Sequence, residues 1–385
     1  MRTKNALPRQ HSRRMRSGTI AVAVALSGLL TFTACGSNST STTESSSAPS
    51  GGGGNGTVGV ILPETATSAR WESFDKPMLQ QALRAQGFDA DVQNAQGDVQ
   101  KFTTLADGMI AKGVKVLIVA SINSEVGSAV AAKAKKAGIP TIDYDRLNLG
   151  GSSDYYVSFD NVRVGELQGQ ALITALKDKP AAQVVEIEGA PTDNNATLFH
   201  QGQLKALQPL YDSGVLKLVR SQAIDGWDNQ KGGSTFEQIL TGNGGKVDGV
   251  VAANDGLAGA VITVLKKNGL NGKVPVTGQD ATADGLKAVL RGDQYMTVFK
   301  PIKDEAESAA KLAAALAKGD TAAADALAQG VSQDPKGKRD VKSVLLTPQT
   351  ITRADVKQVT DAGFVKASDI CGGELKAACT ELGIS

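Results

Sequence analysis

Short apolar runs alternate with longer amphipathic stretches over most of the chain. The runs predict strands at 58–62, 114–120, 140–144, 155–159, 183–187, 217–222, 247–253, 274–278 and 295–299. Between them apolar residues recur with helical spacing, as at Met78, Leu79, Ala82 and Leu83 before Gly87. Strands that are apolar at nearly every position are typical of parallel sheets covered on both faces, so the alternation predicts an α/β protein.

An internal echo indicates that part of this pattern occurs twice. A run at 116–120, a helical stretch and a run ending at Asp145 resemble a run at 248–252, a helical stretch and a run ending at Asp280. Two similar lobes beside a cleft produce such a repeat, and a generic resemblance between strand–helix–strand units is the alternative. Even without residues 1–56, the 385-residue chain exceeds the roughly 250–300 residues at which single cores stop growing.

The N-terminus departs from this pattern. Residues 1–17 carry six basic residues and no acid, an apolar stretch follows at 20–30, and Thr33 and Ala34 precede Cys35. This order predicts a secretory signal peptide over 1–34, because the apolar stretch is shorter than the about 20 residues that span a bilayer. Cys35 is then expected to be acylated as the first mature residue. Cleavage nearby, with Cys35 left as a free thiol, is the alternative.

Residues 35–56 are mostly Ser, Thr, Gly, Asn and Pro, which predicts a flexible, lipid-anchored tether. Cleavage after residue 34 leaves 35 basic against 39 acidic residues, a net charge near −4. A mildly acidic body offers no electrostatic footprint for nucleic acid. The sequence therefore predicts an exported protein held at the outer face of the cytoplasmic membrane, in a periplasm or at a cell surface.

Two further cysteines lie near the C-terminus. If Cys35 carries lipid, Cys371 and Cys379 remain as a pair in an oxidising compartment, which favours a disulfide. Two buried thiols are the alternative.

Polar residues gather directly after the predicted strands, where open parallel sheets meet their ligands. They are Asp145-Arg146, Asp160-Asn161, Asp193-Asn194-Asn195, Asn254-Asp255, Gln279-Asp280 and Lys300-Pro301. A helix cap explains any one of them taken alone. Six such groups in both halves of the chain predict a common binding site.

The two tryptophans, Trp71 and Trp227, also follow predicted strands, one in each half of the chain. Core burial is the ordinary role of either, whereas polar neighbours favour a place at the rim of a cleft. Flat indoles suit the C–H faces of a sugar ring, and carboxylates, amides and cations suit its hydroxyls. Such a site rejects a sugar that lacks the matching hydroxyl, because its buried polar groups are left unpaired.

Enzyme classes lack essential parts in this sequence. Beyond Cys35 there is one histidine, His200, which excludes multi-histidine metal sites and leaves a Ser-His-Asp triad dependent on a residue expected at the surface. The G-x-G-x-x-G match at 51–56 precedes its strand and lies in the tether, so it is not a dinucleotide loop. No cofactor is expected. A carboxylate pair that hydrolyses a glycoside remains the enzymatic alternative.

Eight motifs carry a family resemblance. They are DYDR (143–146), SFDN (158–161), GELQ (165–168), TDNNA (192–196), DGW (225–227), AND (253–255), GQD (278–280) and TVFKP (297–301). In this order, between about residues 58 and 364, the chain resembles the D-xylose-binding proteins of ABC importers, within the ribose/galactose-type periplasmic binding proteins. The resemblance implies two Rossmann-like lobes with parallel sheets, joined by a three-segment hinge that closes on the ligand. The lobes are expected at 57–161 plus 300–344 and at 162–299 plus 345–385.

The resemblance also implies the residues of the cleft. They are Arg70, Trp71, Asp145, Arg146, Asn194 or Asn195, Trp227, Asn254, Asp280 and Lys300. Where the family usually has a basic residue and then an acid after the tryptophan, this chain has Ser73 and Phe74, which affects the identity of the sugar and not its class. The stretch after about residue 367 lies outside the resemblance.

The partners implied are a monosaccharide, D-xylose first, an ABC permease and the membrane through the lipid anchor, with the protein itself a monomer. A sensor that feeds a chemoreceptor or a histidine kinase is the alternative and uses the same cleft. A transcription-factor relative is excluded, because an export signal stands where a helix-turn-helix is needed.

Overall fold

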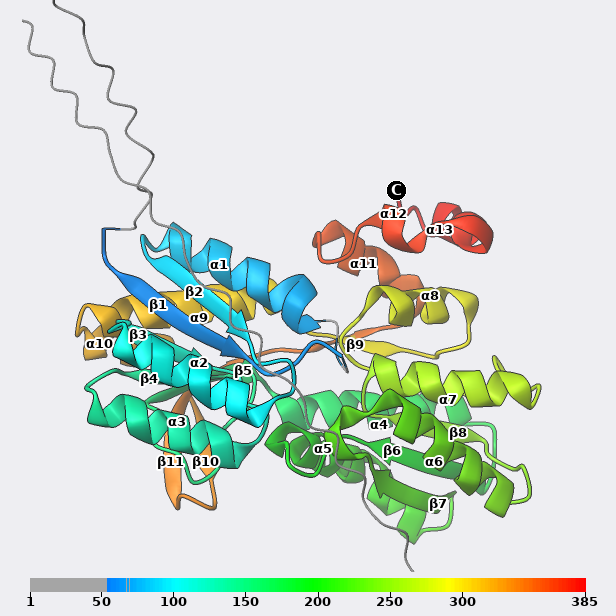
Figure 1. The fold of residues 1–385 in the computed structure, drawn as a ribbon. Coiled ribbons are helices and arrows are strands. Elements are labelled where there is room, and N and C mark those ends of the chain that lie inside the picture. The colour runs from blue at the N-terminus through cyan, green and yellow to red at the C-terminus, as the bar shows by residue number, and fades with distance from the viewer. Residues whose placement is uncertain (1–53, 67, 69) are drawn as a thin grey trace, which may run out of the picture. The chain divides into compact units, whose positions relative to one another are not determined.

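The computed structural model describes residues 54–66, 68 and 70–385. Most of them form two sheets covered by helices (Figure 1). The predicted signal peptide, Cys35 and most of the predicted tether lie outside them. Among the described residues, no helix combines the length and apolar character needed to cross a membrane.

The larger sheet contains seven strands, all parallel except the edge strand at 330–334, which is antiparallel to its neighbour. In spatial order they are β10 (Gly330–Asp334), β11 (Arg339–Leu346), β5 (Tyr155–Phe159), β4 (Thr141–Tyr144), β3 (Val116–Val119), β1 (Thr57–Leu62) and β2 (Asp89–Asn94). Its helices are α1 (Lys76–Ala85), α2 (Val99–Ala111), α3 (Ser124–Lys136), α9 (Ile302–Ala317) and α10 (Thr321–Leu327). Alternate strand residues point to opposite faces: Val116 and Ile118 pack with α1 and α9, whereas Leu117 and Val119 pack with α2 and α3.

The smaller sheet has three parallel strands. In spatial order they are β7 (Leu216–Ala223), β6 (Ala182–Glu188) and β8 (Gly249–Ala252). The helices around it are α4 (Asn161–Leu176), α5 (Asn194–Asp212), α6 (Asn229–Gly242), α7 (Asp255–Lys267) and α8 (Ala283–Arg291). The predicted strand at 274–278 contributes only one bridge, Val276 to Val250, beside β8.

Beyond these sheets, β9 (Thr297–Phe299) pairs antiparallel with β12 (Gln349–Ile351). The chain then ends in short helices, which we call the C-terminal segment (residues 352–385). They are η3 (Arg353–Asp355), α11 (Val356–Asp361), α12 (Ala367–Ile370), η4 (Gly373–Leu375) and α13 (Lys376–Glu381). A disulfide joins Cys371 to Cys379 within the segment. Its apolar side chains share a core with α8, β9 and β12.

The predicted α/β class is confirmed. Apart from 274–278, each predicted strand is present with ends within two residues of the prediction. The strands that the pattern missed are β2, β10, β11 and β12. The edge strands β2 and β10 carry few buried apolar residues, and so they lack the signal that marks a central strand.

The chain crosses between the two sheets at three places. These are Asp160 after β5, residues 300–301 after β9 and residues 347–348 after β11. Each crossing follows the carboxyl end of a strand, so polar residues from both sheets are brought to one region. The exact lobe boundaries stay a prediction.

Candidate functional site

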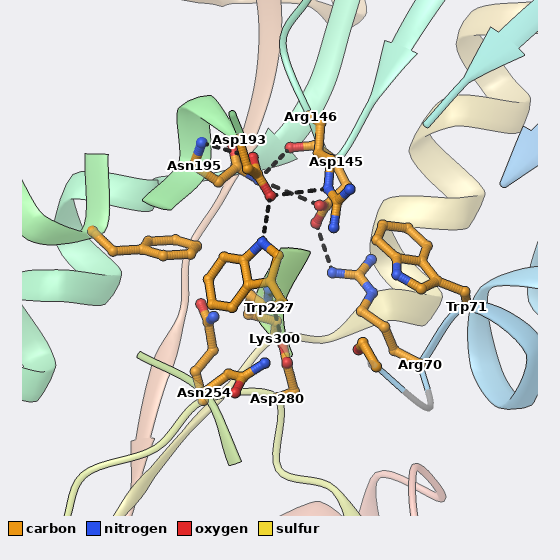
Figure 2. Close-up of a pocket in the computed structure, with 13 residues that line it drawn as sticks. Arg70, Trp71, Asp145, Arg146, Asp193, Asn195, Trp227, Asn254, Asp280 and Lys300 are labelled. Carbon is orange, nitrogen blue, oxygen red and sulfur yellow. Dashed lines mark hydrogen bonds and ion pairs between the residues drawn. The ribbon is translucent and has the colours of Figure 1, made fainter. Parts of the chain in front are cut away.

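A small pocket lies where the strand ends of the two sheets meet. Figure 2 shows its side chains converging from both sides. The lining residues are Ser68, Arg70, Trp71, Asp145, Arg146, Asp193, Asn195, Phe199, Trp227, Asn254, Gln279, Asp280 and Lys300.

Every predicted cleft residue lines this pocket except Asn194. Asn194 is half-buried at the start of α5, while its neighbour Asn195 is 3% exposed and faces the pocket. Sequence reasoning did not select Asp193, Phe199, Gln279 or Ser68 as ligand contacts. Asp193 and Gln279 were among the polar residues that follow predicted strands, and that position was their available signal. Phe199 follows Asn195 by one helical turn, and that spacing was its available signal.

Arg70 organises the side of the pocket that belongs to the larger sheet. Its side chain is 3% exposed, and its guanidinium contacts three carboxylates. Nε and Nη2 donate to the two oxygens of Asp75 at 2.9 and 2.7 Å, Nη2 also donates to Glu305 at 2.9 Å, and Nη1 donates to Asp145 at 2.6 Å. Because buried charges are costly unless paired, this network holds Asp145 in one position.

The pKa values of two acids around Arg70 are shifted in opposite directions. Burial raises the pKa of Glu305 well above its usual value, and the nearby Asp145 adds to this effect while Arg70 opposes it. Burial also opposes ionisation of Asp145, but Arg70 and Lys300 hold the pKa of its carboxyl below the usual value. Asp145 is therefore the ionised acceptor at the pocket.

The backbone of Asp145 has a left-handed conformation, with φ of 60°. A non-glycine residue adopts it only when its surroundings compensate for the strain. Here the Asp145 N–H donates to the Val157 carbonyl at 2.8 Å. Its carbonyl accepts from Tyr156 Oη, Ser158 Oγ and Asn195 Nδ2, each at 2.8 Å. Because Asn195 belongs to α5, this last bond links the two sides of the pocket.

A second link between the two sides runs through Asp193. Its Oδ2 accepts from Trp227 Nε1 at 3.1 Å and pairs with Arg146 Nε at 3.0 Å. Arg146 follows β4, whereas Asp193 is the N-cap of α5 and accepts from the Asn195 N–H. Asp193 thus caps a helix, orients an indole and carries an ion pair at once.

Asp280 and Lys300 form the corner of the pocket on the smaller-sheet side. Asp280 has φ of 95°, and its Oδ1 lies 3.0 Å from Lys300 Nζ. The ammonium lies 5.6 and 5.9 Å from the ring centroids of Phe159 and Phe199. Aromatic faces attract a cation at such distances, so the rings help to hold Lys300 in the pocket.

Asn254 both caps a helix and lines the pocket. Its Oδ1 accepts from the Leu257 N–H at 2.9 Å and caps α7, and the residue also lines the pocket. Asp160, by contrast, is exposed and caps α4, so for that residue the capping explanation holds and the site explanation does not.

The expected position of Trp227 at the rim, outside a core, is wrong. Trp71 is 1% exposed and belongs to the core of the larger sheet, and Trp227 is 8% exposed and belongs to that of the smaller sheet. Both nevertheless line the pocket. An indole is large enough to fill a core with one part and border a cavity with another, so these roles coincide.

Two buried acids support the loops behind the pocket. Asp143 accepts from a backbone N–H and two side chains within 148–153, and Asp255 accepts from a backbone N–H and three side chains within 282–297. Burial raises the pKa of Asp143 to about 6 and that of Asp255 to about 7.

The residue considered for an enzymatic triad lies away from the pocket. The side chain of His200 is 35% exposed, and its Nε2 lies 3.6 Å from Glu186. Within the described part of the chain, no group of His, Cys, Asp and Glu is arranged to hold a metal ion.

Residues 58–321 match the periplasmic binding protein domain family. The D-xylose-binding periplasmic protein of Escherichia coli (strain K12) is 39% identical over 302 residues, 78% of this chain and 88% of that protein. The multiple sugar-binding periplasmic receptor ChvE of Rhizobium radiobacter is 34% identical over 333 residues, 82% of this chain and 92% of that protein. A carbohydrate transporter solute binding protein from Chloroflexus aurantiacus, solved with D-glucose, is 31% identical with a TM-score of 0.75 and covers 81% of this chain and 97% of its own.

Proposed function

The chain belongs to the periplasmic binding proteins, and we propose that it is the sugar receptor of an ABC importer. It binds one monosaccharide, D-xylose foremost, between its two sheets and delivers it to a membrane permease. The observation that carries this proposal is a pocket that combines two indoles with ionised and amide side chains from both halves of the chain.

Two buried polar atoms of the pocket favour a ligand with hydroxyl groups. Trp71 Nε1 is a donor and Gln279 Oε1 an acceptor, and neither has a hydrogen-bond partner among the described residues. Leaving such groups unpaired costs about 1–3 kcal/mol each. A hydroxyl both donates and accepts, so a sugar satisfies both kinds of atom.

The named ligands of two relatives support a monosaccharide. D-xylose is the first candidate because the Escherichia coli relative is a D-xylose-binding protein. The relative from Rhizobium radiobacter is a multiple sugar-binding receptor, so hexoses belong in the test.

Ligand binding and closure use the same residues. Asn195 reaches Asp145, and Asp193 reaches Arg146, across the pocket. A sugar held by both sides strengthens these contacts and stabilises the closed arrangement, which the permease then recognises.

We expect no turnover of the bound sugar. A glycosidase needs a carboxylic acid that keeps its proton near neutral pH and donates it to the leaving group. Asp145 has the opposite property, because its cationic neighbours lower its pKa. Glu305 has a raised pKa, but it is fully buried behind Arg70 and does not line the pocket.

Calorimetry against D-xylose, D-ribose, L-arabinose, D-glucose and D-galactose tests the proposal. We expect micromolar or tighter binding of at least one sugar and no product. Asn195→Ala removes a pocket side chain, and Asn194→Ala changes the adjacent residue outside it. The first is expected to weaken binding at least tenfold and the second to leave it unchanged. No heat with any sugar, or steady release of product from a glycoside, contradicts the proposal.

The membrane anchor is a separate part of the proposal. Cys35 directly follows the predicted signal and precedes the predicted tether, so we expect it to be acylated. Cys35→Ser should move the protein from the membrane to the soluble fraction of fractionated cells. Membrane association that survives this change rules out Cys35 as the anchor.

A further inference from the structure

Phe74, which departs from the family pattern, makes an unexpected contact. It lies in the π-helical turn η1 (Trp71–Asp75), between a pocket tryptophan and the main partner of Arg70. Its ring stacks on that of Phe364, with centroids 4.3 Å apart and an angle of 20° between the planes. Phe364 follows α11, so the C-terminal segment packs directly behind the pocket loop.

The same Phe364 ring contacts a second element of the site. Its centroid lies 5.1 Å from that of Phe299 in an edge-to-face arrangement, with 62° between the planes. Phe299 ends β9 and immediately precedes Lys300. One aromatic ring therefore touches both segments that supply the buried cations of the pocket, Arg70 and Lys300.

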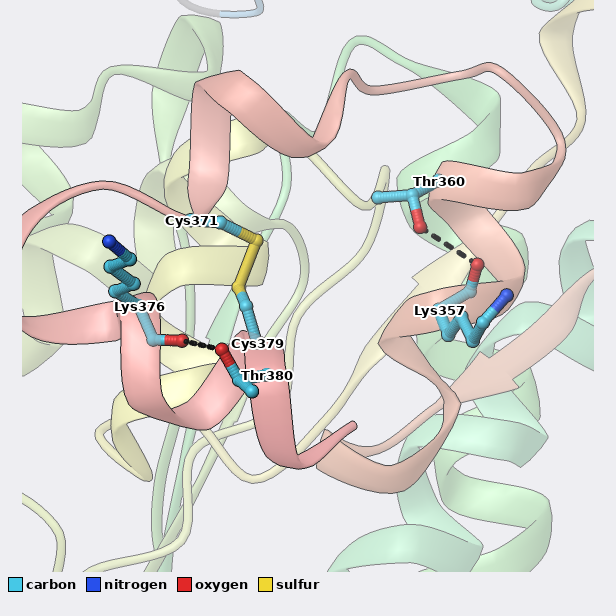
Figure 3. The surroundings of a disulfide bond; sticks show 6 residues. All are labelled: Lys357, Thr360, Cys371, Lys376, Cys379 and Thr380. Carbon is cyan, nitrogen blue, oxygen red and sulfur yellow. Dashed lines mark hydrogen bonds between the residues drawn. A yellow bond between two sulfur atoms is a disulfide. The ribbon is translucent and has the colours of Figure 1, made fainter. Parts of the chain in front are cut away.

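Phe364 is itself held firmly by the C-terminal segment. It is 7% exposed and shares a core with Val356, Val359 and Ile370, each 0% exposed. Its N–H donates to the Val359 carbonyl at 3.2 Å. Figure 3 shows the disulfide between Cys371 and Cys379 in the neighbouring part of the segment.

We propose that Phe364 is a positioning residue for the sugar site, through the rings of Phe74 and Phe299. This inference rests on the proposed function. Phe364 does not line the pocket. Its ring fixes the turn that carries Trp71 and Asp75 on one side and the strand end before Lys300 on the other. The C-terminal segment thus acts on ligand affinity as well as on the stability of its own core.

The physical reason is the precision that a buried polar site demands. Such groups work only when held within about 0.5 Å of their productive positions, by neighbours locked in place by packing. Asp75 directly follows Phe74 and accepts two hydrogen bonds from the Arg70 guanidinium. A turn that loses its stacking partner shifts Asp75, and Arg70 shifts with it.

The test compares two truncations in the same core. Phe364→Ala removes the ring, whereas Leu375→Ala truncates an aliphatic residue of the same core, 5% exposed, and leaves the rings of Phe74, Phe299 and Phe364 in place. Both are expected to lower the melting temperature. Only Phe364→Ala should weaken the affinity for the best sugar of the panel, by about tenfold, measured well below both transitions. Phe364→Tyr keeps the ring and should restore the affinity.

A purely structural role predicts a different result. If Phe364→Ala lowers the melting temperature and its sugar affinity equals that of the wild type, the inference is wrong. If Phe364→Ala does not fold, Phe74→Leu removes the stacking ring from the opposite side and must show the same loss of affinity. A wild-type protein that binds no sugar contradicts the proposed function instead, so the two failures are distinguishable.

Discussion

The corners of the pocket at Asp145 and Asp280 share backbone features and differ in their side-chain environments. Each aspartate ends a strand–helix–strand unit, and each has a positive φ, 60° and 95°. The Asp145 N–H donates to the Val157 carbonyl, and the Asp280 N–H donates to the Val298 carbonyl, both at 2.8 Å. The echo in the sequence therefore has an atomic counterpart at the site.

The similarity extends to the helix that precedes each corner. Asn123 caps α3 and accepts from the Val126 N–H at 3.0 Å, and Asn254 caps α7 and accepts from the Leu257 N–H at 2.9 Å. Only Asn254 lines the pocket, while Asn123 lies on an adjoining groove. The same asparagine cap thus contributes to the pocket in one half of the chain and not in the other.

The two corners differ in how their charges are held. Arg70 forms ion pairs with Asp145 and two further carboxylates, whereas Lys300 forms an ion pair with Asp280 and acts on Asp145 from a greater distance. The first corner is thus a network of direct ion pairs between distant residues, and the second has one direct pair. The repeated backbone fixes the position of the aspartate, and the neighbouring elements determine which cations pair with it.

Substituting the cation of each corner should lower the free energy of unfolding by different amounts. Arg70→Met leaves three buried carboxylates without their cation, so we expect a loss of about 3–5 kcal/mol of stability and no measurable sugar binding. Lys300→Met leaves one carboxylate and should cost about 1–3 kcal/mol. Urea unfolding measures both, with exposed Lys303→Met as the control. Equal losses for Arg70→Met and Lys300→Met would show that the corners are held alike.

Trp227 belongs both to the core of the smaller sheet and to the pocket, so its substitution tests both roles. Trp227→Ala removes a core side chain as well as a pocket wall, so we expect both a loss of about 3–5 kcal/mol of stability and weaker sugar binding. Trp227→Phe keeps most of the packing and loses the hydrogen bond to Asp193, so it should retain most of the stability. Thermal unfolding and calorimetry of both variants decide. If Trp227→Ala is as stable as the wild type, Trp227 lies at the rim of the cleft as the sequence predicted, and not in a core.

The pH dependence of stability should differ between the halves. The folded-state pKa is about 6 for Asp143 and about 7 for Asp255, both above the ordinary 3.8. Their stabilising contributions are therefore complete below about pH 4 and are lost as the pH rises through each folded-state value.

Replacing either aspartate by asparagine removes its contribution to the fall in stability with rising pH. Asp255→Asn should reduce the fall in stability up to about pH 7, by on the order of 4 kcal/mol, and Asp143→Asn should reduce it only up to about pH 6. Urea unfolding between pH 4 and 8 measures the slopes, with exposed Asp178→Asn as the control. Slopes that match the wild type contradict the raised values.

The smallest effect separates capping from ligand contact. Serine caps a helix about as well as asparagine, so Asn254→Ser should preserve stability within about 0.5 kcal/mol. It removes the amide from the pocket and should weaken sugar binding several-fold. Asn123→Ser makes the same change at the equivalent position outside the main pocket and should leave binding intact. Calorimetry of the two variants measures the difference, and equal affinities would remove Asn254 from the site.

The sequence by itself determined the α/β class and the edge at which the site lies. Continuous apolar runs require burial on both faces, and that requirement is local to each strand. Polar residues directly after those runs must then gather at the carboxyl ends of the strands. This reasoning predicted Asp145 and Asp280 and their common position in the two halves.

Only the tertiary structure decided which of these residues act together. Asp75 and Glu305 lie 5 and 235 residues from Arg70, and no local period joins the three. The choice of Asn195 over Asn194 depends on the rotation of α5 at its first turn. The stacking of Phe74 on Phe364 depends on where the chain's last segment packs. These features arise from contacts between distant elements, whose energies have no signature in the order of residues along one strand or helix.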